Sequence, residues 1–228
     1  MTLKVVKFSE GIKRQDKLDF CSRTRCAFIP NRANPHTFYR HQKTICARMQ
    51  SDGEIMGDFF KLACERFSVR KFSAREVEAE KIQRIVEAGL RAPTACNLQP
   101  YRIWVVKSGE AREKALGAVP FPFVRDAPAL LVVGASEQEG WVRKFDGKNF
   151  ADIDAAIVAT QMMLQIHDLG LGTTWIGHFD EKALKDSFEQ MRGFNLIAIF
   201  PVGYIADDCE PAKGHTEKKP REQIVAEL

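Results

Sequence analysis

The segment Ala92-Pro-Thr-Ala-Cys-Asn-Leu-Gln-Pro-Tyr101 joins an amphipathic run to a strand-like run, and the rest of the chain is organised around it. Proline fixes its own φ and moves the preceding residue out of the α region, so the two prolines hold a non-helical loop at both ends. Between them lie Thr94, Asn97 and Gln99 and no charged side chain. A rigid loop with neutral amide and hydroxyl groups suits a planar heterocycle with several ring acceptors. The alternative is an ordinary helix-to-strand connection with turn residues.

The runs on either side of this loop predict a helix and a strand. Apolar residues at helical spacing predict a helix over residues 74–90, with Ser73 as its N-cap and Glu76 in capping-box position. The run Arg102-Ile-Trp-Val-Val106 predicts a strand. The loop is therefore expected where a helix leads into a sheet.

A basic segment, Arg66-Phe-Ser-Val-Arg-Lys-Phe72, precedes the predicted helix. Successive side chains of an extended chain point to opposite sides, so Arg66, Ser68 and Arg70 are expected on the same side. Because guanidinium groups bind phosphate through two parallel hydrogen bonds, this side is a candidate phosphate site. The alternative is a solvated basic edge strand.

The second half of the chain also alternates between helical and strand-like runs. Residues 129–135 show no polar alternation, which predicts a strand buried on both faces. Residues 150–169 predict the longest helix, apolar around much of its girth and so buried centrally or at a subunit interface. Shorter elements are expected at residues 59–67, 111–117, 172–177, 180–188 and 196–204, with a mobile connector or lid at 137–149.

Length and motif content limit the class of protein. With 228 residues, of which 45% are hydrophobic, the chain is long enough for a sizeable core. Alternating helices and short apolar strands predict an α/β or α+β domain over residues 57–228. The sequence contains no G-x-G-x-x-G motif after the first strand, no P-loop motif, no HExxH and no Ser/His/Asp grouping. These absences argue against the usual dinucleotide and P-loop sites and against hydrolysis.

Residues 1–56 are predicted to form a basic extension without a readable fold. Residues 1–50 carry eleven Lys and Arg against three acids, whereas the whole chain has a net charge of +4. The remainder is therefore mildly acidic, which argues against nucleic-acid binding by the main domain. The Cys and His residues between Cys21 and Cys46 fit none of the usual zinc spacings, so no metal is predicted. Met49 and Met56 are candidate starts of the natural product.

The chain also lacks the patterns of a membrane or secreted protein. No apolar run reaches the ~20 residues that span a bilayer, and no signal-peptide pattern follows Met1. The six cysteines are scattered and include no CxxC pair. We therefore expect a cytoplasmic protein with free thiols.

Four motifs together resemble the FMN-dependent nitroreductase family. They are Arg66-Phe-Ser-Val-Arg70, the loop at residues 92–100, the run Gly-Leu-Gly-Thr-Thr-Trp-Ile-Gly177 after a long helix, and a closing Lys-Lys-Pro. They occur in the family's order and cover roughly residues 59–225. The resemblance implies an α+β sandwich with a mixed central sheet flanked by helices. It further implies a homodimer, with the long helix at the interface and two FMN molecules in clefts between the subunits.

The resemblance also assigns residues to the flavin. In chain order they are Arg66, Phe67, Ser68, Arg70, Pro93, Thr94, Asn97, Gln99, Ile176, Gly177, Lys218 and Lys219. By position, Arg66, Ser68 and Arg70 would hold the phosphate, the ribityl chain and the N1/O2 edge of the ring. Thr94 stands where a serine is commoner and keeps the hydroxyl group.

Other parts of the site are implied to come from different segments. The loop at residues 93–99 would reach the flavin from the other subunit, and the backbone around Ile176 and Gly177 would face flavin N5. A basic residue near the C terminus meets the phosphate in this family, often as arginine. Lys218 or Lys219 is the better candidate for this role here, and Arg221 is the third.

The implied activity is an NAD(P)H-dependent FMN oxidoreductase with a ping-pong cycle. A nicotinamide donor gives hydride to flavin N5, and a nitroaromatic, a quinone or another electron-poor acceptor then receives it. The flavin carries the chemistry, so no catalytic side chain is predicted. Phe121, Phe123 and Trp141 are candidates for the lining of the acceptor slot. The alternatives are a dehalogenase-like, pteridine- or enal-reducing enzyme of this fold, or a flavin-binding regulatory protein whose basic arm contacts a partner.

Overall fold

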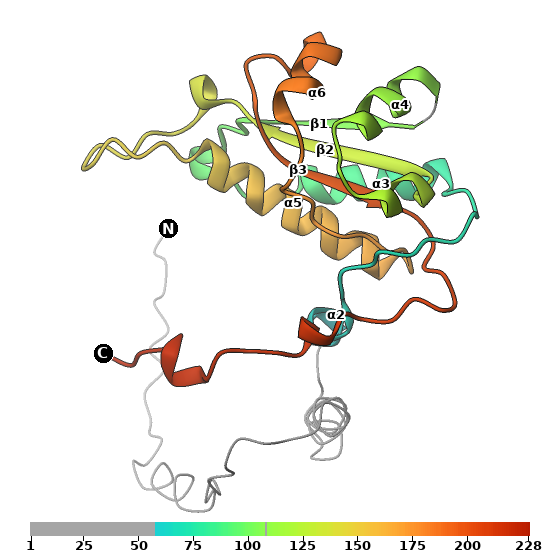
Figure 1. Ribbon diagram of the computed structural model, residues 1–228. Helices are drawn as coiled ribbons and strands as arrows, with labels where there is room; N and C mark the ends of the chain where they lie inside the picture. Colours follow the sequence, from blue (N-terminus) through green and yellow to red (C-terminus); the bar gives the residue numbers. More distant parts are fainter. Residues whose placement is uncertain (1–57, 108) are drawn as a thin grey trace, which may run out of the picture.

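An antiparallel sheet forms the middle layer of the structure, a computed structural model that describes residues 58–107 and 109–228 (Figure 1). The strands are β1 (Tyr101–Val106), β2 (Ala129–Ala135) and β3 (Asn195–Val202), and β2 lies between the other two. The helices are α2 (Asp58–Glu65), α3 (Ala79–Leu90), α4 (Gly109–Gly117), α5 (Ala151–Asp168) and α6 (Glu181–Ser187). Short 3-10 turns include η1 (Ala95–Asn97) and η5 (Lys213–His215). Helices α3 and α5 cover one face of the sheet, and α4 and α6 cover the other.

Strand β2 is buried on both faces, which confirms the prediction for this run. Leu131 and Val133 belong to the core beneath α3 and α5, whereas Leu130 and Val132 belong to the core beneath α4 and α6. Alternate side chains of a strand point to opposite faces, and both faces here meet apolar helices. The absence of polar alternation in this strand therefore follows from its place at the centre of three layers.

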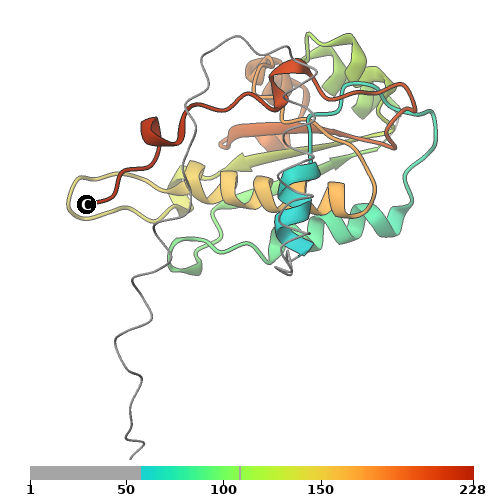
Figure 2. The ribbon, with the colours of Figure 1, turned by 90° about the horizontal axis from the view of Figure 1, so that it is seen from below.

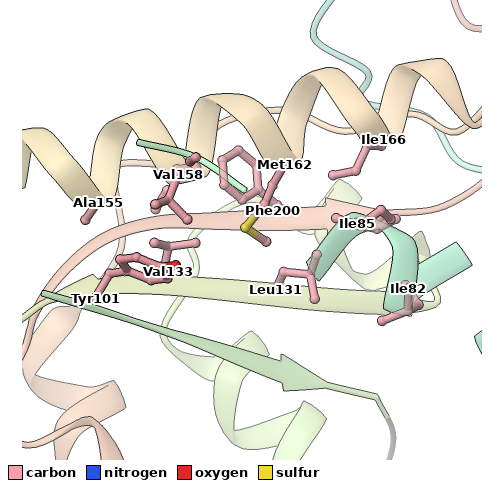
Figure 3. Close-up of a cluster of buried hydrophobic side chains, with 14 of the residues drawn as sticks. Ile82, Ile85, Tyr101, Leu131, Val133, Ala155, Val158, Met162, Ile166 and Phe200 are labelled. Atoms are coloured by element: carbon pink, nitrogen blue, oxygen red, sulfur yellow. The ribbon is translucent and has the colours of Figure 1, made fainter. Parts of the chain in front are cut away.

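Helix α5 lies along the sheet with α3 beside it (Figure 2). Val158 and Met162 of α5 pack against Phe200 of β3, and all three side chains are fully buried (Figure 3). A Cβ atom on Gly89 of α3 would lie 2.8 Å from Met162 Cγ, so glycine is what lets the two helices approach. The outer side of α5 differs, since Ile157 is 39% exposed. The helix is thus buried against the sheet on one side and leaves apolar surface on the other.

One predicted helix boundary and one predicted strand are wrong. The helix expected from residue 74 begins at Ala79, and the hydroxyl of Ser73 accepts from the nearby Arg75 N–H instead of capping the helix. Ser73 N donates to Tyr204 O at 2.8 Å and Phe72 pairs with Ile205, so pairing with a distant segment keeps this part of the chain extended. The run 172–177 forms isolated bridges rather than a continuous strand.

Three further predictions concern membrane spans, metal sites and the N-terminal extension. No helix in the described part of the chain is both long and apolar enough to cross a membrane. Within the same residues, no three His, Cys, Asp or Glu side chains gather closely enough to hold a metal ion. The predicted basic extension, the Cys21–Cys46 pattern and the alternative starts lie outside the described residues.

A polar network joins the start of α3 to the chain beyond β3. Tyr204 Oη donates to Glu78 Oε2 at 2.8 Å, and Lys81 Nζ donates to Tyr204 Oη at 2.8 Å. Arg75 Nη2 donates to Glu78 Oε1 at 2.7 Å. A hydrogen bond from its own backbone, followed by those from Tyr204 and Arg75, lowers the pKa of Glu78 from 4.5 to about 2.

The free energy of unfolding is therefore expected to depend on pH through Glu78. Its folded-state pKa lies below the unfolded value of 4.5, so its stabilisation is fully present above that pH and is lost as the pH falls towards about 2. Urea unfolding in a series of acidic buffers should show a weaker loss of stability for Glu78→Gln than for the wild type. Glu80→Gln, a change at an exposed residue of the same helix, should keep the wild-type pH dependence. Parallel curves for Glu78→Gln and the wild type would contradict this role.

Candidate functional site

The basic segment at residues 66–72 is extended and lies beside the run 172–177. Ser68 pairs with Thr173 in a parallel bridge, and Val69 N donates to Thr173 O at 2.9 Å. Val69 is 1% exposed, whereas Arg70 is exposed and Ser68 is half-buried. Val69 thus faces the interior and the neighbouring Ser68 and Arg70 do not, whereas Arg66 N still donates to Leu62 O at 3.0 Å, as in the preceding helix. The structure thus brings together two of the four motifs that the sequence singled out.

Gly172 sets how closely these two segments approach. A Cβ atom on Gly172 would lie 2.8 Å from both methyl carbons of Val69. Gly172→Ala is therefore expected to displace the basic segment and to lower the free energy of unfolding by about 1–3 kcal/mol. Gly117→Ala in α4 is the control, because no atom of the described residues lies within 4 Å of the added one. Chemical denaturation of both variants tests this, and equal stabilities would contradict the close approach.

The C-terminal tail returns to the basic segment. The ring of His215 in η5 lies edge-on to that of Phe67, with centroids 6.2 Å apart. Burial, Lys218 and Arg66 all lower the pKa of His215, which places both cations within electrostatic reach of this ring. Arg66, His215 and Lys218 therefore form a basic cluster made from opposite ends of the described chain.

The cations of this site form no ion pair with another described residue. Within the described residues, neither Arg66 nor Arg70 forms an ion pair, and the same holds for Lys218. Lys218 Nζ donates only a long hydrogen bond, 3.4 Å, to His215 O. Lys219 and Arg221 are exposed further along the tail. A group of unpaired cations is the arrangement that an anion such as a phosphate monoester requires.

The second part of the predicted site is the proline-bounded loop. Cys96, Asn97 and Gln99 have φ of 50°, 55° and 54°, in the left-handed region that non-glycine residues rarely adopt. Gln99 N donates to Thr94 Oγ1 at 3.1 Å, which holds the loop in this turn. The side chains of Asn97 and Gln99 are exposed, and so is Pro93. The loop therefore presents its amide groups to the outside of the chain that carries them.

The loop and the basic cluster lie at opposite ends of α5. Ala95 N donates to Asp154 Oδ1 in the first turn of this helix, whereas Arg66 lies close enough to His167 in the last turn to influence its pKa. Thirteen residues separate these two positions, or about 20 Å at 1.5 Å per residue. Figure 2 shows the loop beside one end of α5 and α2, which leads into Arg66, nearer the other. One chain therefore does not bring the two parts together.

The run ending at Gly177 leads into a group of aromatic rings formed by Phe121, Phe123 and His178. Ile176 exchanges both backbone hydrogen bonds with Ile199 at 3.0 Å and is buried, whereas Gly177 is exposed and no backbone partner for its N–H occurs in the described residues. Phe121 stacks on Phe123 with centroids 5.8 Å apart and lies 6.0 Å from the ring of His178. Of the two predicted backbone positions, Gly177 is thus the one that remains open to a ligand.

The three aromatic candidates do not gather at one place. Phe121 and Phe123 lie near Gly177, whereas Trp141 packs against Phe150, just before α5, with centroids 5.1 Å apart. The connector predicted at 137–149 contains an antiparallel bridge between Val142 and Asn149, so part of it is a hairpin. A depression of about 420 Å³ between α3 and β1 shares no residue with the predicted site.

A family model described as the nitroreductase family matches residues 63–120 and 116–204. The chain belongs to the nitroreductase family. It is 39% identical over 194 residues to a protein of Thermus thermophilus named NADH dehydrogenase, covering 72% of this chain and 92% of that protein. The family resemblance that the four motifs predicted is confirmed.

Solved structures agree with this family and with the fold. A nitroreductase family protein from Clostridium difficile is 33% identical, with a TM-score of 0.67 over 73% of this chain and 95% of that one. An FMN-dependent nitroreductase from the same species is 26% identical, with a TM-score of 0.54 over 65% and 87% of the two chains. The predicted α+β fold is confirmed; the three-stranded sheet is antiparallel, and the parallel bridge between Ser68 and Thr173 lies outside its strands.

Reasoning from the sequence missed three residues that the structure places in or beside the site. His215 lies three residues before Lys218, and its proximity to Phe67 depends on how the tail folds back. His178 directly follows Gly177 and contacts Phe121. Asp154 is a charged residue within a helix predicted to be apolar, and that contrast was a usable signal.

Proposed function

We propose that the protein is an NAD(P)H-dependent FMN oxidoreductase that reduces nitroaromatics, quinones or similar electron-poor acceptors. The observation that carries the proposal is the basic cluster, in which Arg66 and Lys218 both lie within electrostatic reach of the His215 ring without a carboxylate partner in the described residues, next to the extended segment that carries Ser68. Family membership makes the chain an oxidoreductase and supports flavin as the bound group. When bound, FMN accepts a hydride from a nicotinamide and passes it to an acceptor.

The residues present fit this cofactor. A phosphate monoester carries close to two negative charges, and Arg66 and Lys218 supply two cations, one of them a guanidinium suited to bidentate binding. The hydroxyl of Thr173 is buried and has no partner among the described residues. It belongs to the residue that bridges to Ser68, so a polar ligand along this segment would have an additional group to bind.

Each remaining group has a role that follows from its chemistry. Ser68 offers a hydroxyl group to the ribityl chain, and Arg70 is a permanent cation for the ring edge that gains negative charge on reduction. Gly177 offers a backbone N–H without a side chain above it. Phe121, Phe123 and His178 provide flat surfaces near this glycine, on which an aromatic acceptor can stack.

We further propose that the working form is a homodimer in which each site takes groups from both chains. The loop and the basic cluster are separated by most of α5 within one chain, so a ligand that contacts both needs the loop of a second copy. Two α5 helices crossing in opposite directions bring the first turn of one near the last turn of the other. Phe59 of α2 is 69% exposed, Phe60 is 45% exposed and Ile157 is 39% exposed, which provides apolar surface for such a contact.

The test is an absorbance spectrum of the purified protein, recorded anaerobically before and after NADPH and, separately, NADH. A flavin band that bleaches with either donor and returns with a nitroaromatic or a quinone supports the proposal and identifies the donor. A colourless protein that takes up no added FMN contradicts it. A yellow protein that neither donor bleaches supports a flavin-binding regulatory role instead.

A further inference from the structure

Asp154 is a buried carboxylate in the first turn of α5. It is 2% exposed, and its position in the sequence lies within a predominantly apolar helix. Taking a carboxylate out of water is costly unless it is hydrogen-bonded, so a buried one calls for an explanation. Its place near the helix N-terminus reduces this cost, because the N-terminal end of a helix attracts negative charge. The helix N-terminus makes a buried carboxylate less costly at this position, but it does not explain why the position holds a carboxylate.

The hydrogen bond of Asp154 leads to the proline-bounded loop. Its Oδ1 accepts from Ala95 N at 3.0 Å, across 59 residues of sequence, while Oδ2 has no partner in the described residues. Its first turn is otherwise held by short-range hydrogen bonds, such as Asn97 N to Thr94 O at 3.0 Å and Gln99 N to Thr94 Oγ1 at 3.1 Å, while Ser136 N donates to Pro100 O at the far end of the loop at 2.9 Å. The contact with Asp154 therefore ties a local turn to the rigid frame of the domain.

The loop requires such a tie because its backbone is strained. Three of its residues, Cys96, Asn97 and Gln99, occupy the left-handed region. This conformation costs free energy for a non-glycine residue. It persists only where contacts from the surrounding structure hold the backbone in place. Without an anchor, a segment that lies exposed on the surface would relax to other conformations. Its amide side chains would then no longer be presented together.

We propose that Asp154 is a positioning residue that holds the proline-bounded loop in its flavin-binding conformation through the Ala95 N–H. This inference rests on the proposed function, since it assigns to Asp154 the orientation of the groups that Thr94, Asn97 and Gln99 present. Asp154 does not itself touch the ligand. It acts by fixing where the backbone of the loop turns.

The experiment compares three variants of the full chain. Asp154→Ala removes the acceptor, Asp154→Asn keeps a carbonyl oxygen that can accept from Ala95, and Asp152→Ala removes an exposed carboxylate from the same helical turn as a control. FMN dissociation constants are measured by fluorescence, and hydrogen exchange of the loop peptide is measured without FMN. Asp154→Ala should weaken FMN binding about tenfold or more, the effect of losing a hydrogen bond to a charged group, and should speed exchange in the loop.

The other two variants should remain close to the wild type in both measurements. In Asp154→Ala, turnover at saturating FMN should recover, which separates loss of positioning from loss of the fold. Unchanged affinity and exchange in a folded Asp154→Ala would overturn the inference. An Asp154→Asn variant as defective as Asp154→Ala would overturn it as well, because the acceptor would then not be what matters.

Ala95→Pro tests the same contact from the loop and applies also if Asp154→Ala does not fold. Proline removes the N–H, fits the first position of a 3-10 turn, and follows Thr94, whose φ of −133° and ψ of 158° suit a residue before proline. It should weaken FMN binding as Asp154→Ala does, and wild-type affinity would contradict the inference. If the wild type itself binds no FMN, the proposed function fails, while loop exchange in the variants still decides the role of Asp154.

Discussion

Replacing Arg66 with alanine is expected to weaken FMN binding by about 10- to 100-fold, the effect of losing charge-assisted hydrogen bonds to a phosphate. Arg66 is the guanidinium of the basic cluster, and no carboxylate in the described residues competes for it. Enzymatic activity should fall in parallel at limiting FMN and recover in part when FMN is added in excess. Fluorescence titration of the apoprotein with FMN measures the affinity directly.

Two further variants separate the role of the guanidinium from the effect of charge. Arg66→Lys keeps the charge but not the planar fork, so its affinity should lie between those of the wild type and Arg66→Ala. Arg84→Ala removes an exposed arginine of α3 and should bind FMN normally. A yellow, fully active Arg66→Ala protein would rule out the phosphate role of Arg66.

Mixing two inactive variants is expected to restore activity if each site is shared between chains. Arg66→Ala damages the basic cluster, and Asn97→Ala damages the loop at the opposite end of α5. In a heterodimer of the two, one site carries both defects and the other carries neither. Random exchange of equal amounts gives heterodimers for half of the molecules, so about a quarter of all sites should be intact.

The measurement is NAD(P)H-dependent turnover at limiting FMN, before and after the two variants are unfolded together and refolded. Each variant refolded alone is the control and should remain near its original low activity. Recovery towards a quarter of the wild-type rate supports a shared site. A mixture that stays at the average of the two variants, although exchange is verified by mass spectrometry, would contradict sharing and would assign both groups to one chain.

The position of the loop and of the main elements follows from local patterns in the sequence. Pro93 and Pro100 restrict their own backbone and that of their neighbours wherever they occur, so a break between helix and strand was predictable. The uninterrupted apolar run of β2 and the long apolar run of α5 likewise predict burial, because the hydrophobic effect acts on these segments in any fold. The order of the four motifs was enough to predict the family.

Contacts between distant segments were decided only by the tertiary structure. Helix α3 starts at Ala79 because Phe72 and Ser73 pair with Ile205 and Tyr204, a competition that a local capping signal does not report. Arg66 and Lys218, more than 150 positions apart, both come within electrostatic reach of His215, and no local periodicity encodes this. The role of Asp154 also depends on where α5 lies relative to the loop.

The distance between the proline-bounded loop and the basic cluster shows the same difference between what local sequence determines and what tertiary structure decides. The sequence by itself determined which groups are available: guanidinium and ammonium cations, hydroxyl groups, and amides on a constrained loop. The length and direction of α5 place the loop at its first turn and Arg66 near its last. Chemical identity is a property of each residue, whereas distance is set by the packing of a rigid helix against a sheet. The family resemblance implied that the two parts come from different subunits, and only the tertiary structure gives the distance at which one chain holds them apart.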